Sequence, residues 1–256
     1  MNRILAVAAN TFREAIRDKV LYNLVFFALL VMGVSVILGK MTLGERLKII
    51  QDVSLAAMSV FGLLIAVFVG IGLVHKEIQR RTIHVLLARP LARWEFVVGK
   101  YLGLMAVIAI NVAVMTAALF ALVALFSDAG SSPGLGYAVL LILVELTVMT
   151  GVAILFSTFS TPTLSAMFTL GVWIIGRLSS DLMALAARSE SAVVRVVTAV
   201  VHYVLPNLEK FDLKDEVVYR MPIDPAYVAG AVLYGAVYIL FLMLLSAAIF
   251  QRREFK

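Results

Sequence analysis

Residues 135–156 read LGYAVLLILVELTVMTGVAILF, an apolar stretch that contains a single charged side chain, Glu145. A helix needs about 20 mostly apolar residues to cross the roughly 30 Å hydrocarbon core of a bilayer, and this stretch is long enough. We therefore predict a transmembrane helix that carries a carboxyl group near its middle.

Five more stretches of the chain have the same character. Charged residues make up 15% of the sequence, against about 25% in an ordinary soluble domain, and the mean hydropathy is +1.02. The further predicted spans are residues 21–38, 55–74, 102–126, 164–187 and 227–250. Because no internal repeat or low-complexity tract divides the chain, we predict an all-α membrane protein with six transmembrane helices in one domain, residues 1–256.

Residues 1–20 predict an amphipathic helix that lies in the membrane interface. At 100° per residue, apolar side chains fall on one side of this helix and charged ones on the other. The apolar side comprises Ile4, Leu5, Ala8, Phe12, Ala15 and Ile16. Because Arg13, Glu14, Arg17 and Asp18 precede any long apolar run, we do not expect a cleavable signal peptide.

The distribution of cations predicts the orientation, since cytoplasmic loops of membrane proteins are enriched in Lys and Arg. With six spans and a cytoplasmic N-terminus, 13 of the 22 Lys and Arg residues fall on the cytoplasmic side and eight outside, while Arg177 lies within a span. We therefore expect a multi-pass protein of the cell membrane with both termini in the cytoplasm.

Residues 191–205, SAVVRVVTAVVHYVL, are apolar enough to suggest a seventh span. They are short for one, and they contain Arg195 and His202. A seventh span would also export the cationic C-terminal sequence QRREFK, against the usual charge bias. We therefore predict a helix on, or dipping into, the outer face, within an extracytoplasmic segment at 188–225 that either seals this face as a lid or docks a substrate or partner.

The largest cytoplasmic feature is the loop 75–100, in which residues 76–100 read KEIQRRTIHVLLARPLARWEFVVGK and include six Lys or Arg. Pro90 disfavours helix at Arg89, so we predict a helical elbow, with a second helix starting near Trp94. Cations alone hold a loop on the cytoplasmic side and contact anionic lipid. That role does not account for Glu77, the leucine pair or Trp94.

The order of residues in this elbow resembles the cytoplasmic-loop signature of ABC-2 type permeases, the membrane subunits of a class of ABC transporters. The matching residues are Glu77, Thr82, Leu86, Leu87, Pro90, Arg93, Glu95, Gly99 and Lys100. Arg81 and Ala92 depart from the signature, in which glycine and serine are usual. The sequence VLPNLEKFDLK at 204–214 also resembles a segment of one branch of these permeases, and the order of helices fits over most of the chain.

This resemblance implies that the elbow is a coupling helix that docks into a groove on a separate ABC-type ATPase subunit, which binds the ATP and Mg²⁺. The implied coupling residues are Glu77, Arg80, Arg81, Thr82, Leu86, Leu87, Arg89, Pro90, Arg93, Trp94 and Glu95. Apolar and aromatic side chains would anchor the contact and charges would set its register. The resemblance also implies a second permease subunit, identical or related, an export direction and a bacterial inner membrane.

No motif on this chain predicts catalysis, a metal or a bound nucleotide. The nearest approach to a phosphate-binding loop, GVSVILGKMT at residues 33–42, has five residues between its glycines instead of four, and Met41 where Ser or Thr is required. The chain has no cysteine, and its three histidines lack metal-ligand spacing. We expect no cofactor on this chain and no nucleic-acid partner.

Ionisable residues at bilayer depth cost about 2.5–3.5 kcal/mol each on insertion scales, so each one needs a reason. Glu145 in the fourth span and Arg177 and Asp181 in the fifth lie at similar predicted depths, so we predict an ionic cluster. The same stripe of the fifth span also carries Ser165, Thr169, Trp173 and Ser180. Either the ion pair fixes the register of two helices or the stripe lines a translocation path. In a rival class, a secondary transporter or channel, these three charges would carry ions or protons.

Small residues predict close helix packing in the second and third spans. Gly62, Ala66 and Gly70 recur every four positions, and Gly99 and Gly103 begin the third span. Such residues let helix backbones approach within one subunit or across a dimer.

Overall fold

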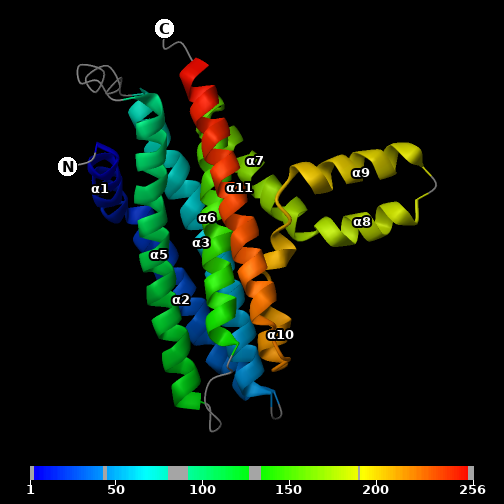
Figure 1. Ribbon diagram of the computed structural model, residues 1–256. Coiled ribbons are helices and arrows are strands. Elements are labelled where there is room, and N and C mark those ends of the chain that lie inside the picture. The colour runs from blue at the N-terminus through cyan, green and yellow to red at the C-terminus, as the bar shows by residue number, and fades with distance from the viewer. Residues whose placement is uncertain (1–2, 43–44, 80–91, 127–133, 190, 253–256) are drawn as a thin grey trace.

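Long apolar helices run side by side through most of the molecule (Figure 1). The structure is a computed structural model that describes residues 3–42, 45–79, 92–126, 134–189 and 191–252. Every regular element in these ranges is a helix, as predicted for the fold class.

Five helices in the described part of the chain are long and apolar enough to cross a membrane. They are α2 (Lys19–Lys40), α3 (Arg46–Gln79), α5 (Arg93–Phe126), α6 (Leu135–Phe159) and α11 (Pro225–Arg252). They contain the predicted spans 21–38, 55–74, 102–126, 135–156 and 227–250. Both α3 and α5 have 34 residues, which corresponds to about 51 Å of helix.

The helix α6 occupies the centre of the bundle, and α2 and α11 lie at its periphery. Most of α6 is buried, whereas large apolar side chains of α2, such as Phe26 and Phe27, and of α11, such as Leu233 and Val237, are exposed. Lipid tails are as apolar as these side chains, so this arrangement fits a helix bundle surrounded by lipid.

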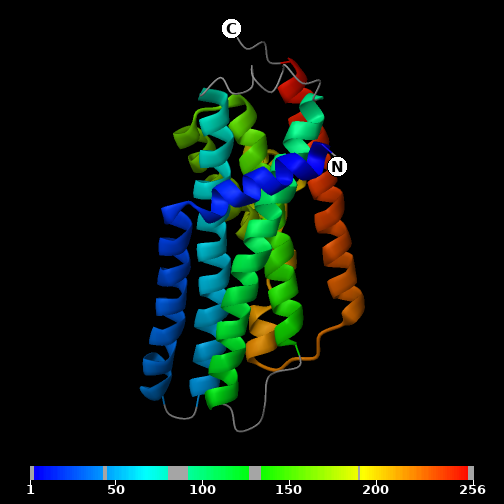
Figure 2. The same ribbon diagram turned by 90° about the vertical axis from the view of Figure 1, so that its left-hand side faces the viewer.

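The N-terminal helix α1 (Arg3–Ile16) runs across the long helices and packs on α5 (Figure 2). Its contact face includes the buried residues Thr11 and Ala15, while Leu5 is exposed. The contact face therefore includes part of the predicted apolar side, to which Ala15 belongs, and leaves out Leu5. Its position in the membrane interface stays a prediction.

The predicted fifth span, residues 164–187, is wrong as a continuous helix. The chain forms α7 (Pro162–Arg177) and α8 (Ser179–Ala187), which are bent by 61° at Leu178. The later elements η1 (Leu208–Phe211) and α10 (Lys214–Val218) lie below the end of α7 in Figure 1, and the η1 residues Leu208 and Phe211 are buried in the core.

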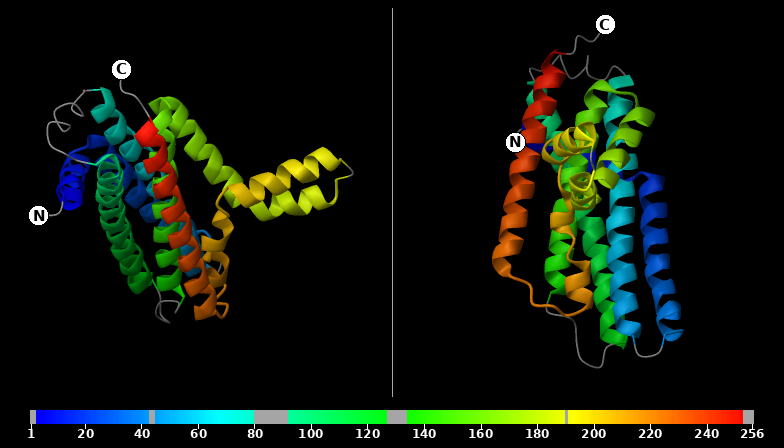
Figure 3. Two further views of the ribbon diagram at one scale, coloured as in Figure 1. Left: turned by 45° about the horizontal axis from the view of Figure 1, so that its top comes forward. Right: turned by 90° about the vertical axis from the view of Figure 1, so that its right-hand side faces the viewer.

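Between α7 and η1 the chain makes a helical hairpin of α8 and α9 (Ala192–Val204) that projects sideways from the half of the bundle that contains the C-terminal end of α11 (Figures 1 and 3). The prediction of a helix at 191–205 is correct, and its expected position on the outer face stays a prediction. Helix α9 packs along α8, and a hydrogen bond joins the two helices between Ser179 Oγ and His202 Nδ1, which are 2.7 Å apart.

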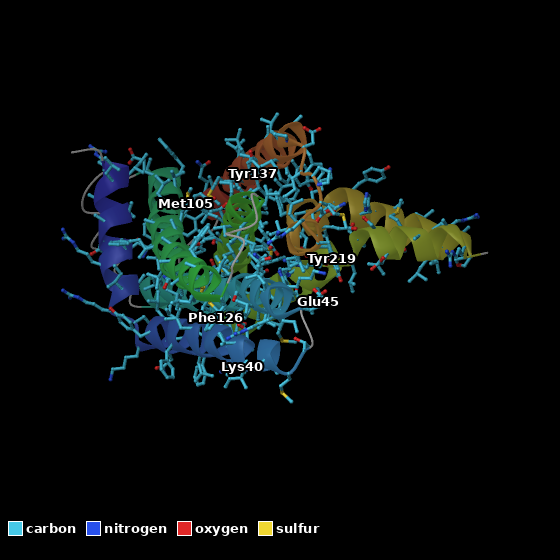
Figure 4. The ribbon with its side chains drawn as sticks, turned by 90° about the horizontal axis from the view of Figure 1, so that it is seen from below. Lys40, Glu45, Met105, Phe126, Tyr137 and Tyr219 are labelled. Atoms are coloured by element: carbon cyan, nitrogen blue, oxygen red, sulfur yellow. The ribbon has the colours of Figure 1, made fainter. Side chains whose placement is uncertain are left out.

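The end of the bundle opposite the 75–100 elbow is seen in Figure 4, which labels Glu45, Phe126 and Tyr219. Two cations of α3 pack on aromatic rings there. The guanidinium of Arg46 lies 4.0 Å from the Phe126 ring centre, and the Lys48 ammonium lies 5.2 Å from that of Tyr219. These contacts join the first turn of α3 to the end of α5 and to the residue after α10.

Candidate functional site

A buried ionic site lies where α3, α6 and α7 meet. Glu145 comes from the middle of α6, and its side chain is 0% exposed. Ser59 comes from α3, and Arg177 is the last residue of α7. Leu178 follows it as the C-terminal cap of α7, and the Leu178 N–H donates to the Ile174 carbonyl.

Both oxygens of the Glu145 carboxylate accept hydrogen bonds. Arg177 donates from Nη2 to Oε2 at 2.8 Å and to Oε1 at 3.0 Å, and from Nε to Oε1 at 3.2 Å. The indole Nε1 of Trp173 donates to Oε1 at 2.9 Å, and the Ser59 hydroxyl donates to Oε2 at 3.3 Å. Because the carboxylate has several charge-assisted donors, its burial does not leave an uncompensated charge.

The second acidic partner of Arg177 is Asp212, not Asp181. Arg177 Nη1 donates to Asp212 Oδ2, and the Lys214 ammonium lies 3.7 Å from the same oxygen. The predicted membership of Asp181 in this cluster is wrong, because the bend at Leu178 turns α8 away and leaves Asp181 exposed. Asp181 would lie next to Arg177, four residues earlier, only if the helix continued unbroken between them.

The four charged groups, Glu145, Asp212, Arg177 and Lys214, sum to zero charge and link α3, α6 and α7 to the segment between η1 and α10. Arg177 also donates to Ser59 Oγ at 2.8 Å. This geometry holds helices in register. Protein groups donate to both oxygens of the Glu145 carboxylate, which is the arrangement expected of a structural ion pair; a place on a translocation path stays a prediction.

The remaining residues of the predicted stripe separate into buried and exposed groups. Ser165 and Thr169 are fully buried, and Thr169 donates to the Ser165 carbonyl at 2.7 Å. Trp173 is partly buried beside Glu145, whereas Ser180 is exposed on α8. Ser179, one residue earlier, is the one that turns inward. The stripe is therefore continuous only along α7.

The predicted ATPase-coupling loop lies partly outside the described residues. This is the case for Arg80, Arg81, Thr82, Leu86, Leu87, Arg89 and Pro90. Glu77 lies in the last turns of α3, and Arg93 is the first residue of α5. Trp94 is 45% exposed, and Glu95 accepts a hydrogen bond from the Ala92 N–H at 3.0 Å. This bond caps the start of α5, so Trp94 sits on an ordered first turn.

A family model described as "ABC-2 family transporter protein" matches residues 5–255, almost the entire chain. The chain belongs to this family. It is therefore an ABC-2 type permease, a multi-pass membrane component of transport. A search of curated proteins found no match.

The small residues of this permease are used within the subunit. A Cβ added to Gly62 would lie 2.4 Å from Leu146 Cδ1 of α6, and one added to Gly70 would lie 3.6 Å from Leu104 Cδ1 of α5. Ala66 is buried between them. At Gly99 and Gly103, a Cβ would come within 2.7 Å of Val7 Cβ and 2.6 Å of the Ala8 carbonyl oxygen, both in α1.

Sequence reasoning missed Ser59, Asp212 and Lys214. Ser59 lies three residues before Gly62, on the stripe that continues through Ala66, so the spacing of small residues could have included it. Asp212 and Lys214 belong to the segment VLPNLEKFDLK, which was singled out by resemblance but placed outside the membrane. Helical spacing could not indicate Asp212 and Lys214, because the chain returns to this site only after the α8–α9 hairpin.

Three tyrosines of α11 hold the same returning segment and were also missed. The hydroxyls of Tyr238 and Tyr227 donate to the carbonyls of Val204 and Lys210 at 2.8 and 3.0 Å, and Tyr234 Oη accepts from the Asn207 N–H at 3.0 Å. These bonds satisfy backbone groups that have no helical partner. They show how irregular backbone is accommodated inside the permease.

The phosphate-loop look-alike does not form a loop in the residues that the structure describes. Residues 33–40 of the phosphate-loop look-alike are helical in α2, so their N–H groups are not arranged as a phosphate-binding nest. No group of three His, Asp or Glu side chains in the described part of the permease could hold a metal ion.

Proposed function

We propose that this chain is the permease subunit of an ATP-driven exporter, in which two permease subunits pair and bind two separate ABC-type ATPase subunits. The observation that carries the proposal is the family match over residues 5–255. In this proposal the chain makes six crossings with both termini in the cytoplasm, α7 together with η1 and α10 serving as one interrupted crossing. ATP and Mg²⁺ bind to the partner.

The long helices on either side of the elbow support a route for coupling. Both α3 and α5 continue without a break from the elbow to the opposite end of the bundle. Ser59 of α3 contacts Glu145 and Arg177, so a displacement of α3 at the elbow would act on the buried ionic site. Rigid helices and such polar networks are the elements that carry coupling between distant sites.

The secondary-transporter alternative gains no support from this geometry. A carboxyl group that carries protons needs access to water, whereas Glu145 is fully enclosed and paired with Arg177. Asp181, the third charge of that alternative, lies on α8 outside the cluster.

The test is to purify the tagged chain in mild detergent from its native host and to identify by mass spectrometry what accompanies it. We expect a stoichiometric ATPase of the ABC type. Glu77→Ala and Trp94→Ala should each uncouple ATP hydrolysis from transport while leaving the membrane domain folded. Truncating an interface anchor costs 2 kcal/mol or more, so recovery of the ATPase should also fall by about tenfold or more with Trp94→Ala.

Tyr219→Ala is the matched control, because Tyr219 is an exposed aromatic residue at the opposite end of the bundle, and it should leave recovery of the ATPase unchanged. A solitary protein, also after crosslinking in the membrane, would contradict the proposal.

A further inference from the structure

The α8–α9 hairpin has a surface that the bundle does not cover. No residue of α9 is buried, and Val193, Val196 and Tyr203 are among its most exposed side chains. The hairpin projects from the bundle both in the side view and when seen from below (Figures 1 and 4). Lipid can cover the apolar side chains, but it does not suit the charged ones.

The hairpin leaves the bundle at the depth of the buried ionic site. It begins at Ser179, two residues after Arg177, which contacts Glu145. Glu145 lies about 15 Å along α6 from Leu135, well inside a hydrocarbon core of about 30 Å. Arg188, which follows α8, is about 14 Å further along the hairpin than Ser179.

One stripe of α8 is exposed and carries opposite charges at its two ends. Asp181, Ala184, Leu185 and Arg188 are all exposed, and their i, i+3, i+4, i+7 spacing places them on one face. Ala186 is buried on the other side, towards α9. Along the helix, the exposed stripe therefore carries an acidic, a small, an apolar and a basic residue.

The charges of this stripe lack ionic partners in their own subunit. Within the described ranges of the chain, no salt bridge joins Asp181 or Arg188 to another residue. Uncompensated charges at bilayer depth are costly and usually pair with one another. This stripe therefore fits a protein surface whose charges are complementary to its own.

We infer that the α8 stripe pairs with the same stripe of a second copy of this chain, in antiparallel orientation. Two subunits with the same membrane orientation are related by a twofold axis along the membrane normal, and such an axis reverses the direction of a helix that lies in the membrane plane. An isologous contact brings each residue of one subunit to its counterpart on the other. Asp181 of each copy then meets Arg188 of the other, and Leu185 lies beside the axis.

This inference rests on the proposed function, because it supplies the surface through which two permease subunits pair. It specifies identical subunits, since the stripe is complementary to itself. Ala184 allows close approach at the centre, and the two ion pairs close the ends of the contact. In a membrane, small residues and polar pairs of this kind drive helix association.

The chain has no cysteine, so single cysteines can be introduced without background. Two differently tagged copies, one Asp181→Cys and the other Arg188→Cys, are expressed together in native membranes and treated with a short bifunctional maleimide. We expect a product that carries both tags. Leu185→Cys alone should also crosslink to itself, whereas Tyr22→Cys, on the exposed face of α2, should not. The absence of both products in membranes where the ATPase still co-purifies would overturn the inference and leave the proposed function intact.

A charge exchange separates pairing from folding. Asp181→Arg and Arg188→Asp should each reduce the yield of the Leu185→Cys crosslink by about tenfold, because like charges then face each other. The double variant should restore it, since the exchanged ion pairs form again. An equal yield in both single variants and the parent, or a double variant as poor as the single ones, would contradict the antiparallel pairing.

Discussion

At the scale of single residues, Arg177 joins parts of the chain that are far apart in sequence. It contacts Glu145 and Ser59 in two long helices and Asp212 in the returning segment. Its side chain is 16% exposed and that of Glu145 is 0% exposed. A charge held in this way stabilises the fold only while its partners remain.

Removing one member of this pair should therefore destabilise the protein more than removing both. Breaking a buried ion pair costs about 3–5 kcal/mol, whereas replacing both members by apolar residues is often neutral. We expect Arg177→Leu to lower the free energy of unfolding by an amount in this range, and Arg177→Leu combined with Glu145→Leu to recover much of it. Asp212 keeps Lys214 as a partner in both variants.

The measurement is unfolding in detergent of the two variants and of Glu145→Leu, as a double-mutant cycle. Arg195→Leu is the matched control on an exposed arginine, and it should change stability by no more than about 0.5 kcal/mol. If the two single effects simply add in the double variant, Glu145 and Arg177 do not stabilise each other.

The sequence was sufficient to bring Glu145 and Arg177 to one depth, because both lie near the middle of long apolar runs. It was misleading for Asp181, because helical spacing assumes that the helix continues. Asp212 could not be predicted from periodicity, since its segment is polar and returns to the bundle only after the α8–α9 hairpin. The position of Asp212 is decided by tertiary contacts.

At the scale of elements, the five long helices were predictable from runs of apolar residues, and the bend at Leu178 was not. Neither Pro nor Gly stands at the break, and the sequence around it, GRLSSDLM, has only weak signals of interruption. Gly176, two residues before the break, is where the returning chain crosses α7. A Cβ at this position would lie 2.6 Å from the Pro206 carbonyl oxygen and 2.9 Å from Leu208 Cγ.

Two glycines of α7 provide a matched test of this crossing. Gly176→Ala should destabilise the protein by about 1–3 kcal/mol, because the added methyl group overpacks a contact with backbone. Gly171→Ala should be neutral or stabilise by up to about 1 kcal/mol, because nothing lies within 4 Å of the added Cβ and alanine favours helix. Unfolding of both variants in detergent checks this difference. Equal effects would mean that residues 206–208 do not pack on α7.

At the scale of the whole molecule, the two ends of the bundle differ in what they expose. The last turns of α3, the first turn of α5 and the end of α11 lie at one end, and the α2–α3 junction and α10 at the other (Figures 1 and 2). The positive-inside tendency predicted the first end to be cytoplasmic. In the proposed function the ATPase binds at that end, and the exported substrate leaves at the opposite one.

Two exposed aromatic residues mark these ends and allow the most direct test. Trp94 is 45% exposed on the first turn of α5, and Tyr219 is 60% exposed beyond α10. Each is replaced in turn by the photo-reactive residue benzoyl-phenylalanine, and the protein is irradiated in native membranes. The account predicts that position 94 crosslinks to an ABC-type ATPase and that position 219 does not. An ATPase crosslinked at position 219, or none at position 94 while the ATPase is present, would contradict it.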